Sequence, residues 1–209
     1  MIKILLVDDH QLVRTGIRSV LETERKFKVV GEADTGEQAI EMVAERTPDV
    51  VIMDINMPGM GGIEATRKLL EIEPGLKVIG LSMHHQEPYP SQFLNSGAAA
   101  YLSKDCGAEE MITAILAVNA GDRYIGREVA QHLAMNLFNG KGRTPIAELS
   151  SRELEVLMLV VKGGKIKDIA DKLCISPKTV STYRYRLYNK LGVTSDVELT
   201  RLAVHHQLV

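Results

Sequence analysis

The chain has 209 residues, of which 45% are hydrophobic and 25% charged, and its formal net charge is −2. This balance is typical of a soluble globular protein of one or two domains. No stretch is long and apolar enough to span a bilayer, and the first residues have no signal-peptide pattern, so we expect a cytoplasmic protein without membrane contact. The distant cysteines Cys106 and Cys174 exclude a disulfide framework, and we expect both to be packing residues.

The small net charge hides a strong difference between the two parts of the chain. Residues 1–122 hold 11 Lys and Arg against 19 Asp and Glu, a net charge of −8, whereas residues 123–209 hold 14 against 8, a net charge of +6. This polarity suggests that the carboxyl-terminal part binds a polyanion and that the amino-terminal part has a different role.

Residues 1–122 alternate short apolar runs with helical periodicities. The pattern predicts strands at 3–7, 29–33, 50–54, 77–82 and 98–104, and helices at 11–24, 36–46, 62–72, 91–96 and 108–119. Strands that are apolar on both faces indicate a parallel sheet covered by helices on both sides. Short right-handed connections then predict a doubly wound, five-stranded α/β domain of flavodoxin-like topology. Pro88 and Pro90 should keep the fourth helix short.

The pattern changes after residue 122. We predict a linker at 123–147 with a short helix around 127–137, because Gly, Asn and Pro interrupt the segment 138–145. Residues 148–209 contain only helical periodicities and predict a small all-α domain. Ser150 and Glu153 form a capping-box pattern, and Ser176 followed by Pro177 starts a further helix.

Polar side chains stand where the predicted strands of the first domain end. They are Asp8, Asp9, Asp54, Ser82 and Lys104. Because the carboxyl ends of parallel strands meet at one edge of a sheet, we expect these side chains to converge. Three neighbouring carboxylates cannot all ionise freely, so either one takes up a proton or a divalent cation neutralises them. Oxygen ligands suit Mg²⁺, and Asn56 is placed to add its backbone carbonyl.

The same groups are those needed to accept a phosphoryl group. A metal ion and the Lys104 cation would offset the charge of the phosphoryl oxygens while the Asp54 carboxylate attacks phosphorus. A single Asp after a strand is usually a cap or turn residue, but five such polar residues at consecutive strand ends favour a site.

Residues 1 to about 122 resemble the receiver domain of two-component response regulators. The matching segments are 7–10, 53–59, 81–82 and 97–104. The resemblance implies that Asp54 is the phosphoacceptor, that Asp8 and Asp9 hold Mg²⁺, that Lys104 pairs with the phosphoryl group, and that Ser82 and Tyr101 form a switch. Phosphorylation adds about 1.5 to 2 negative charges, which can draw the Ser82 hydroxyl inward and let Tyr101 turn in. The alternative is that Tyr101 is only a half-buried strand aromatic.

The segment 168–190 predicts a helix, a tight turn and a second helix. Val180, Leu187 and Leu191 share the packed face of the second helix, and residues 178–190 contain four cations and no acid. A cationic helix is more often a solvated surface, but the turn, the cap and the acid-free face favour a helix in the major groove of double-stranded DNA. The predicted DNA-binding residues are Lys178, Thr179, Ser181, Thr182, Arg184, Tyr185, Arg186, Asn189 and Lys190.

Within this set, we assign different contacts to cations and to uncharged residues. Lys178, Arg184 and Arg186 are predicted to contact phosphates, and Ser181, Thr182 and Tyr185 to contact base edges.

Residues 149 to about 205 resemble the LuxR-type helix-turn-helix domain of the NarL/FixJ family. The segments concerned are 149–157, 169–180 and 190–193. Ser181 and Tyr183 replace a lysine and a histidine that are usual there, so the resemblance implies no base preference. Together with the segments 183–186 and 195–199, the whole chain resembles the GacA/UvrY/VarA group. This implies a bacterial global regulator driven by a hybrid sensor histidine kinase and acting on small-RNA promoters.

We therefore predict a phosphorylation-activated transcription regulator, not a metabolic enzyme, that binds DNA as a homodimer on half-sites about 34 to 36 Å apart. One alternative is an aspartyl-phosphate hydrolase with Asp54 as nucleophile, which would need a substrate pocket and a cap. The other is a phosphorylation-insensitive protein whose receiver only dimerises, against which the full acidic site argues. Two dimer faces are compatible with the sequence: one formed by the first and fifth helices, the other by the fourth-helix region.

Overall fold

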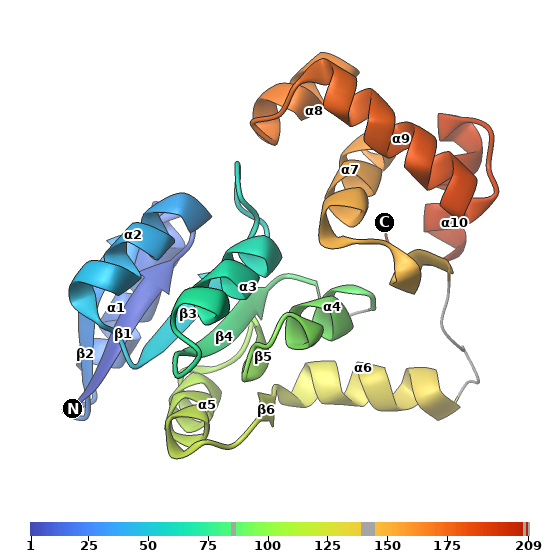
Figure 1. Ribbon diagram of the computed structural model, residues 1–209. Coiled ribbons are helices and arrows are strands. Elements are labelled where there is room, and N and C mark those ends of the chain that lie inside the picture. Colours follow the sequence, from blue (N-terminus) through green and yellow to red (C-terminus); the bar gives the residue numbers. More distant parts are fainter. Residues whose placement is uncertain (85–86, 139–144, 207, 209) are drawn as a thin grey trace. The chain divides into compact units, whose positions relative to one another are not determined.

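The computed structural model describes residues 1–84, 87–138, 145–206 and 208. They form two compact units, Met1–Asn136 and Leu137–Val209 (Figure 1). Among the described residues, no helix combines the length and the hydropathy that crossing a bilayer requires.

The first unit is built around a wholly parallel, six-stranded sheet in the order β2-β1-β3-β4-β5-β6. The strands are β1 Ile2–Val7, β2 Phe27–Ala33, β3 Val50–Asp54, β4 Lys77–Ser82, β5 Ala100–Ser103 and β6 Tyr124–Ile125. The helices between them are α1 Gln11–Glu22, α2 Gly36–Arg46, α3 Gly62–Ile72, α4 Tyr89–Asn95 and α5 Ala108–Ala120. This arrangement confirms the predicted doubly wound α/β fold.

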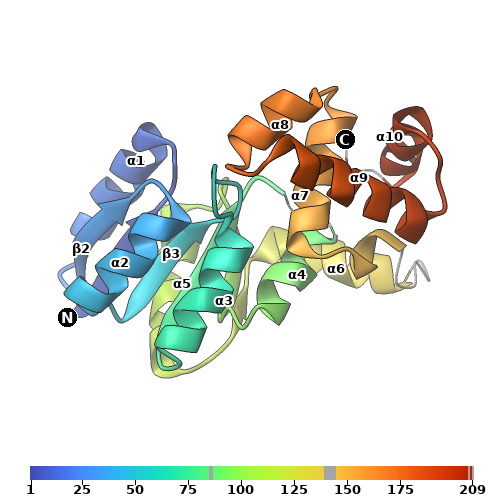
Figure 2. The same ribbon diagram turned by 45° about the horizontal axis from the view of Figure 1, so that its top comes forward.

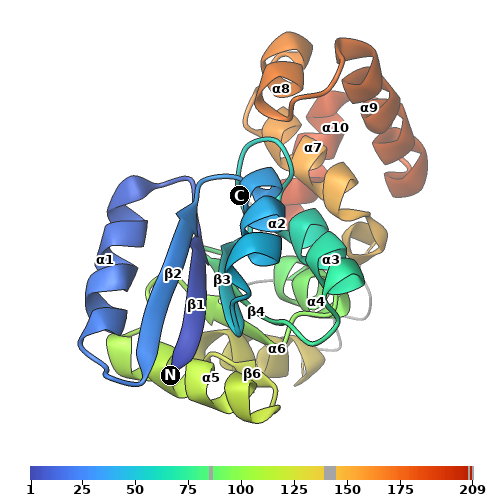
Figure 3. The same cartoon turned by 60° about the vertical axis from the view of Figure 1, so that its left-hand side comes forward.

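Helices cover both faces of the sheet (Figure 3). One face packs against α1 and α5, where Ile4, Ile52 and Leu81 of the strands share a core with Leu21 of α1 and Ile115 of α5. The opposite face carries α2, α3 and α4. Where a strand is covered on both faces, neither row of its side chains meets solvent. This explains the continuous hydrophobic runs in the sequence.

The sheet has one strand more than we predicted. In β6, Tyr124 and Ile125 pair in parallel with Ala100 and Tyr101 of β5. The prediction of five strands was wrong because a two-residue strand is too short to produce an apolar run. The fourth helix has the predicted short length, and Pro90 lies in its first turn, where its missing N–H costs nothing.

The helix predicted around 127–137 is α6, Arg127–Phe138. Its start is tied to the first unit, because the Gly126 N–H donates to the Tyr101 carbonyl at 2.9 Å and the Arg127 N–H to Glu110 Oε1 at 2.7 Å. The residues 123–136, which we assigned to a linker, are thus a folded extension of the first unit. The Gly-rich and Asn-rich part of that linker, 139–144, lies outside the described residues.

The second unit is all-helical among its described residues, as predicted (Figure 2). It contains a 3₁₀ turn at Pro145–Glu148 and the helices α7 Ser151–Val161, α8 Ile166–Lys172, α9 Pro177–Leu191 and α10 Asp196–His205. The α9 helix packs against α7 and α8, and α10 packs against α7. Both predicted caps are present, since the Glu153 N–H donates to Ser150 Oγ at 3.3 Å and the Thr179 N–H to Ser176 Oγ at 3.1 Å.

The two cysteines differ. Cys106 is partly buried and packs against the core of the first unit. Cys174 is exposed, so the prediction of a packing role was wrong for it. It stands in the turn between α8 and α9 with a φ of 52°, in the left-handed region that few residues other than glycine adopt.

Candidate functional site

The carboxyl edge of the sheet brings Asp8, Asp54 and Lys104 into contact. Val7 pairs with Met53 across β1 and β3, so the residues that follow each, Asp8 and Asp54, stand at the same level. Both aspartates are buried, at 2% and 3% exposure. Lys104 follows β5, and its Nζ lies 2.6 Å from Asp8 Oδ2 and 2.9 Å from Asp54 Oδ2. A largely buried ammonium thus bridges two buried carboxylates.

The charges in this pocket are strongly coupled. Burial raises the pKa of Asp54, and the neighbouring Asp8 carboxylate adds to that rise, whereas Lys104 opposes it. Burial would lower the pKa of Lys104, but the hydrogen bonds and charges of Asp54 and Asp8 outweigh it and raise that pKa. Lys104 therefore stays protonated. Its charge does not fully cancel the effect of burial and of Asp8 on Asp54, whose pKa remains raised.

The backbone around Asp54 is also tightly constrained. The Asn56 N–H donates to Asp54 Oδ1 at 3.2 Å and holds the loop beside the carboxylate. At Gly62, the start of α3 approaches Asp54 so closely that a Cβ would lie 2.0 Å from the Asp54 carbonyl oxygen. Any side chain at position 62 would displace Asp54. Our sequence reasoning missed Gly62, for which the adjacent pair Gly61-Gly62 at a helix start was the available signal.

Asp9 and His10 complete the acidic side of the pocket. His10 Nδ1 lies 2.8 Å from Asp9 Oδ1 and 3.3 Å from Asp8 Oδ1. One ligand atom from each of Asp8, Asp9, His10 and Asp54 falls within 4.8 Å of all the others. Asp9 Oδ1 and Asp8 Oδ2 are both buried, the first facing the His10 ring and the second the Lys104 ammonium. The donor set therefore fits a small divalent cation such as Mg²⁺.

Arg14 is a second residue that sequence reasoning missed. Its guanidinium donates to the Asp8 carbonyl through Nη1, and its Nε lies 3.2 Å from Glu32 Oε2 of β2. Arg18 holds the other oxygen of Glu32 at 2.6 Å. Burial would raise the pKa of Glu32, but Arg18 and Arg14 outweigh it and lower that pKa. This ion-pair network fixes the turn that carries Asp8 and Asp9.

Ser82 and Tyr101 lie next to this pocket. Ser82 ends β4, is fully buried, and its Oγ accepts a hydrogen bond from the His84 N–H at 3.0 Å. The Tyr101 hydroxyl donates to the His84 carbonyl at 2.6 Å, and its ring meets Phe93 of α4 edge to face at 6.0 Å. Tyr101 is fully buried, which contradicts the alternative of a half-buried aromatic. Burial raises the pKa of Tyr101, so its hydroxyl remains a donor.

We predict that Asp54→Asn raises the melting temperature of the cation-free protein by a few degrees at pH 7.5. Because folding raises the pKa of Asp54, its stabilising contribution is complete below the unfolded pKa and is lost as pH rises through the folded value. The uncharged amide avoids that loss, so its advantage should shrink as pH falls to 4.5. Melting curves at both pH values test this, with Asp122→Asn at an exposed position as control. A variant that is less stable than the wild type at pH 7.5 would contradict it.

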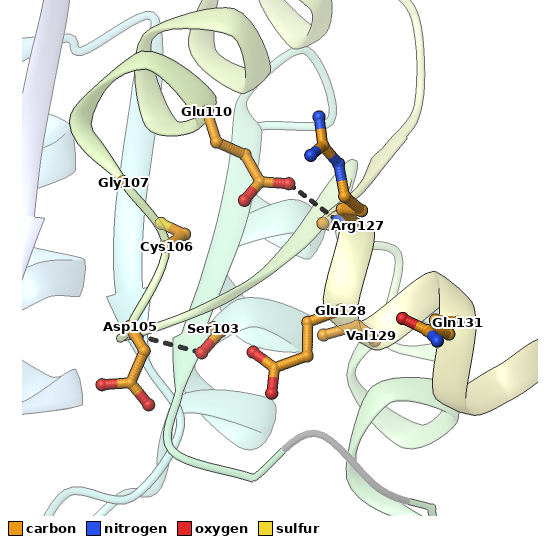
Figure 4. Close-up of a pocket in the computed structure, with 10 residues that line it drawn as sticks. Ser103, Asp105, Cys106, Gly107, Glu110, Arg127, Glu128, Val129 and Gln131 are labelled. Atoms are coloured by element: carbon orange, nitrogen blue, oxygen red, sulfur yellow. Dashed lines mark hydrogen bonds between the residues drawn. The ribbon is translucent and has the colours of Figure 1, made fainter.

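Near β5, a cavity of about 220 Å³ opens beside the starts of α5 and α6 (Figure 4). Ser103 and Cys106 line one side, and Glu110 and Arg127 the other. Its lining residues, all within the described ranges, include none of Asp8, Asp9 and Asp54. It is therefore not the substrate pocket over Asp54 that a hydrolase would need.

The outer face of α9 carries most of the residues that we predicted to bind DNA. Lys178, Ser181, Thr182, Tyr185, Arg186 and Asn189 lie there, and all six are exposed. Tyr185 is 67% exposed, unusually high for a large aromatic side chain. The guanidinium of Arg186 lies 5.8 Å from the ring centre of Tyr183 on the same helix, which orders it. Val180 and Leu187 face the core as predicted.

Three of the predicted DNA-binding residues make hydrogen bonds or ion pairs with other side chains of the second unit, whereas the Ser181 and Thr182 hydroxyls donate to the backbone carbonyls of Pro177 and Lys178 at 3.1 and 3.0 Å. Thr179 is part of the α9 cap, because its N–H and Oγ1 both contact Ser176 Oγ. Arg184 pairs with Asp196 of α10 and approaches the Tyr188 hydroxyl at 3.3 Å. Lys190 Nζ lies 2.7 Å from Glu153 Oε2 of α7. Periodicity placed these residues on a polar face but gave no information on which neighbouring helix supplies their partners.

We predict that Glu153→Ala destabilises the second unit by about 2 kcal/mol, because the variant loses both the capping box and the ion pair with Lys190. Burial would raise the pKa of Glu153, but Lys190 and Ser150 outweigh it and lower that pKa. Its contribution should therefore be present above the unfolded pKa and lost as pH falls through the folded value. Urea unfolding at pH 7 measures the loss, and Lys190→Met separates the ion pair from the cap. Equal stability of Glu153→Ala and wild type would refute this.

Together, a parallel sheet with buried aspartates and a lysine at its carboxyl edge, and a helix-turn-helix unit, define a class: response regulators with a DNA-binding output domain. Residues 4–116 match the family model of the response regulator receiver domain, and residues 147–203 match that of the bacterial regulatory proteins of the luxR family. The chain belongs to the response regulators with a LuxR-type output domain.

Known relatives share both units. The chain is 49% identical over 210 residues to the response regulator GacA of Pseudomonas aeruginosa, covering 100% of this chain and 98% of that protein. It is 46% identical over 209 residues to the response regulator UvrY of Escherichia coli K12, covering 100% and 96%. A solved structure of RcsB from Salmonella enterica serovar Typhimurium, bound to promoter DNA with the phosphomimetic BeF₃⁻, matches with a TM-score of 0.71, 29% identity and 96% coverage of both chains.

These similarities establish the class of function. The protein is a two-component response regulator and a DNA-binding transcription regulator, as predicted. Within this class, the geometry of the acidic pocket and of α9 indicates which residues take part in phosphoryl transfer and in DNA binding.

Proposed function

We propose that Asp54 accepts a phosphoryl group from a partner histidine kinase and that the charge gained there controls DNA binding by the second unit. The observation that supports this most is the buried Asp54 carboxylate, 2.9 Å from the Lys104 ammonium and beside Asp8 and Asp9. Phosphoryl transfer to a carboxylate requires a cation that stabilises the negative charge of the phosphoryl oxygens. Lys104 provides such a cation beside Asp54.

In the proposed transfer, an Asp54 carboxylate oxygen forms a bond to phosphorus as the bond from phosphorus to the kinase histidine nitrogen breaks, and the imidazole leaves. Lys104 pairs with the phosphoryl oxygens. Asp8, Asp9, Asp54 and the Asn56 carbonyl would hold Mg²⁺, which when bound neutralises charge on the phosphoryl oxygens. The raised pKa of Asp54 works against its ionisation, so cations in the pocket favour the nucleophilic form. The receiver thus catalyses its own phosphorylation and dephosphorylation only.

We propose that Ser82 and Tyr101 transmit the change. The Ser82 hydroxyl contacts the His84 N–H, and the Tyr101 hydroxyl contacts the His84 carbonyl, so both depend on the same residue after β4. Drawing Ser82 toward a phosphoryl group would release the backbone at His84 and alter the hold of Tyr101 on it. The surface around His84 would then change.

We propose that α9 binds the major groove of promoter DNA through its outer face. Lys178 and Arg186 are the phosphate contacts that we favour, and Ser181, Thr182 and Tyr185 the base contacts. Arg184 is paired with Asp196 and Lys190 with Glu153, so we assign both cations to holding α9 in place rather than to contacting DNA. We assign 1–122 to the receiver and 148–209 to the DNA-binding domain. The single helix offers a small footprint, which favours a homodimer on two half-sites.

We propose a sensor histidine kinase as the partner, of the hybrid kind that the resemblance to the GacA/UvrY/VarA group implies. Because the proposed target is promoter DNA, we place the protein in the bacterial cytoplasm.

The test is to incubate the full chain with Mg²⁺ and acetyl phosphate, then to measure its mass in solution and its affinity for duplexes selected from a random-sequence pool. The proposal expects phosphorylation to change both quantities, and expects Asp54→Asn to change neither. If phosphorylated wild type binds DNA with unchanged affinity and mass, the receiver does not control the second unit. The phosphorylation-insensitive alternative would then hold.

A further inference from the structure

We propose that Arg14 is a positioning residue for Asp9: by holding the backbone carbonyl of Asp8, it sets the direction in which the Asp9 carboxylate leaves the chain. This rests on the proposed function, in which Asp9 is one of the residues that hold Mg²⁺. It adds a side chain of α1 that contacts neither the ion nor the phosphoryl group. Arg14 thereby governs how tightly the pocket binds Mg²⁺.

The polar groups of Asp8 are each held by a different neighbour. Its N–H donates to the Ala33 carbonyl at the end of β2 at 3.1 Å. Its Oδ1 accepts from the His10 N–H at 2.8 Å, and its Oδ2 lies 2.6 Å from Lys104 Nζ. The remaining group is the backbone carbonyl, and the Arg14 guanidinium donates to it through Nη1. Arg14 thus completes the attachment of Asp8.

This contact also acts on the next residue. A peptide unit is planar, so the direction of the Asp8 carbonyl sets the direction of the Asp9 N–H and the place of the Asp9 Cα. The Asp9 side chain is 27% exposed, against 3% for Asp8, and the His10 ring that it faces at 2.8 Å is itself 66% exposed. Because packing restrains the Asp9 carboxylate less than that of Asp8, its position depends more on the backbone that Arg14 holds.

Arg14 is itself fixed by its surroundings. Its side chain is 15% exposed, and its Nε lies 3.2 Å from Glu32 Oε2 of β2. A planar guanidinium can serve a carboxylate and a carbonyl at the same time, with its donors in a rigid arrangement. Arg18 holds the other oxygen of Glu32 at 2.6 Å. In the described part of the chain, Arg18 therefore shares Glu32 with Arg14 but not the contact with Asp8.

The sign of the effect separates position from charge. Arg14 is a cation near an acidic pocket, so removal of its charge alone would strengthen the binding of Mg²⁺. Loss of its hold on the backbone would weaken that binding, because Asp9 would have to be ordered when the ion binds. Groups that orient a metal ligand contribute about tenfold or more to affinity. Since Glu32 already pairs with the Arg14 charge, we expect the effect of position to dominate.

The experiment measures the melting temperature of the full chain as a function of Mg²⁺ concentration. The value without the ion reports the stability of the fold, and its rise with Mg²⁺ reports the affinity for the ion. The variants are Arg14→Met and, as matched control, Arg18→Met, which also removes one cation and one ion pair with Glu32. Glu32→Gln retains Arg14 but weakens its support. Backbone ¹³C and ¹⁵N NMR signals of the Asp8–Asp9 peptide report on the hydrogen bond at the carbonyl.

We expect Arg14→Met to raise the dissociation constant for Mg²⁺ about tenfold, and Arg18→Met to change it less than about twofold. Both should lower the melting temperature of the cation-free protein by a few degrees. Glu32→Gln should give an intermediate dissociation constant. Phosphorylation of Arg14→Met by acetyl phosphate should need about tenfold more Mg²⁺ for half its maximal rate, with the rate at saturating Mg²⁺ within about twofold of the wild type. The Asp8–Asp9 peptide signals should shift in Arg14→Met and not in Arg18→Met.

Unchanged or tighter Mg²⁺ binding by Arg14→Met would overturn the inference. An equal loss of affinity in Arg18→Met would also overturn it, because the effect would then belong to the ion pairs with Glu32 and not to the Asp8 carbonyl. A wild type that binds no Mg²⁺ would overturn the cation site itself. A wild type that binds Mg²⁺ but is not phosphorylated on Asp54 would overturn the proposed function, while the affinities of the variants would still decide the role of Arg14.

Discussion

Replacing Asp54 by asparagine is expected to abolish covalent phosphorylation of the protein by acetyl phosphate in the presence of Mg²⁺. The amide oxygen of asparagine is a very weak nucleophile, so the expected decrease in rate exceeds about a hundredfold. The substitution preserves the shape of the buried side chain. A measured rise in melting temperature would show that the variant is folded, so that loss of phosphorylation reports on the carboxylate. Intact-protein mass spectrometry measures the gain of one phosphoryl group per chain.

Three further variants make this result specific. Asp122→Asn, at an exposed position away from the acidic pocket, should be phosphorylated like the wild type. Lys104→Met should be phosphorylated more slowly, because it lacks the cation that lies 2.9 Å from the Asp54 carboxylate. Ser82→Ala should still be phosphorylated but should lose the effect on DNA binding. If Asp54→Asn retained the phosphoryl group at the wild-type rate, Asp8 or Asp9 would be the acceptor and the proposed assignment would be wrong.

The sequence was sufficient to predict the sheet and the convergence of its polar strand ends. Strands buried on both faces leave continuous apolar runs, and the parallel arrangement then places Asp8, Asp54 and Lys104 at one edge by topology alone. β6 escaped this reasoning because its pairing depends on where α5 ends. The chain turns at Gly121, with a φ of 100°, and so delivers Tyr124 to the free edge of β5.

The missed residues of the acidic site share a physical reason. Gly62 matters through the absence of a side chain next to the Asp54 carbonyl, and Arg14 through a hydrogen bond to the backbone of Asp8. Strand-end patterns identify side chains that end a strand, but they contain no information on approach distances or on contacts made by the following helix.

The second unit shows the corresponding limit for charges. The pattern predicted which residues of α9 face away from its core, because burial follows the helical period. It could not distinguish Arg184 from Arg186, which are two positions apart. Asp196 and Tyr188 bind the first, whereas the second lies exposed against the Tyr183 ring. This difference makes the two arginines a matched pair for testing the DNA-binding surface.

Arg186→Ala is expected to weaken binding to all DNA sequences and to reduce the slope of log affinity against log salt by about 1, because one phosphate is no longer neutralised. Thr182→Ala should instead change the preference between sequences, by about 1 to 3 kcal/mol at the affected base pair, with the salt slope unchanged. Fluorescence anisotropy with selected and scrambled duplexes at several salt concentrations measures both effects.

Arg184→Ala is the control for charge on the same helix. Because Arg184 is paired with Asp196, removing it should lower the melting temperature of the second unit while leaving the salt slope of DNA binding near that of the wild type. Arg186→Ala should do the reverse, since its guanidinium is exposed and its removal leaves no buried partner. If both variants changed the salt slope equally, the Asp196 pair would open on DNA and Arg184 would rank with Arg186 as a phosphate contact.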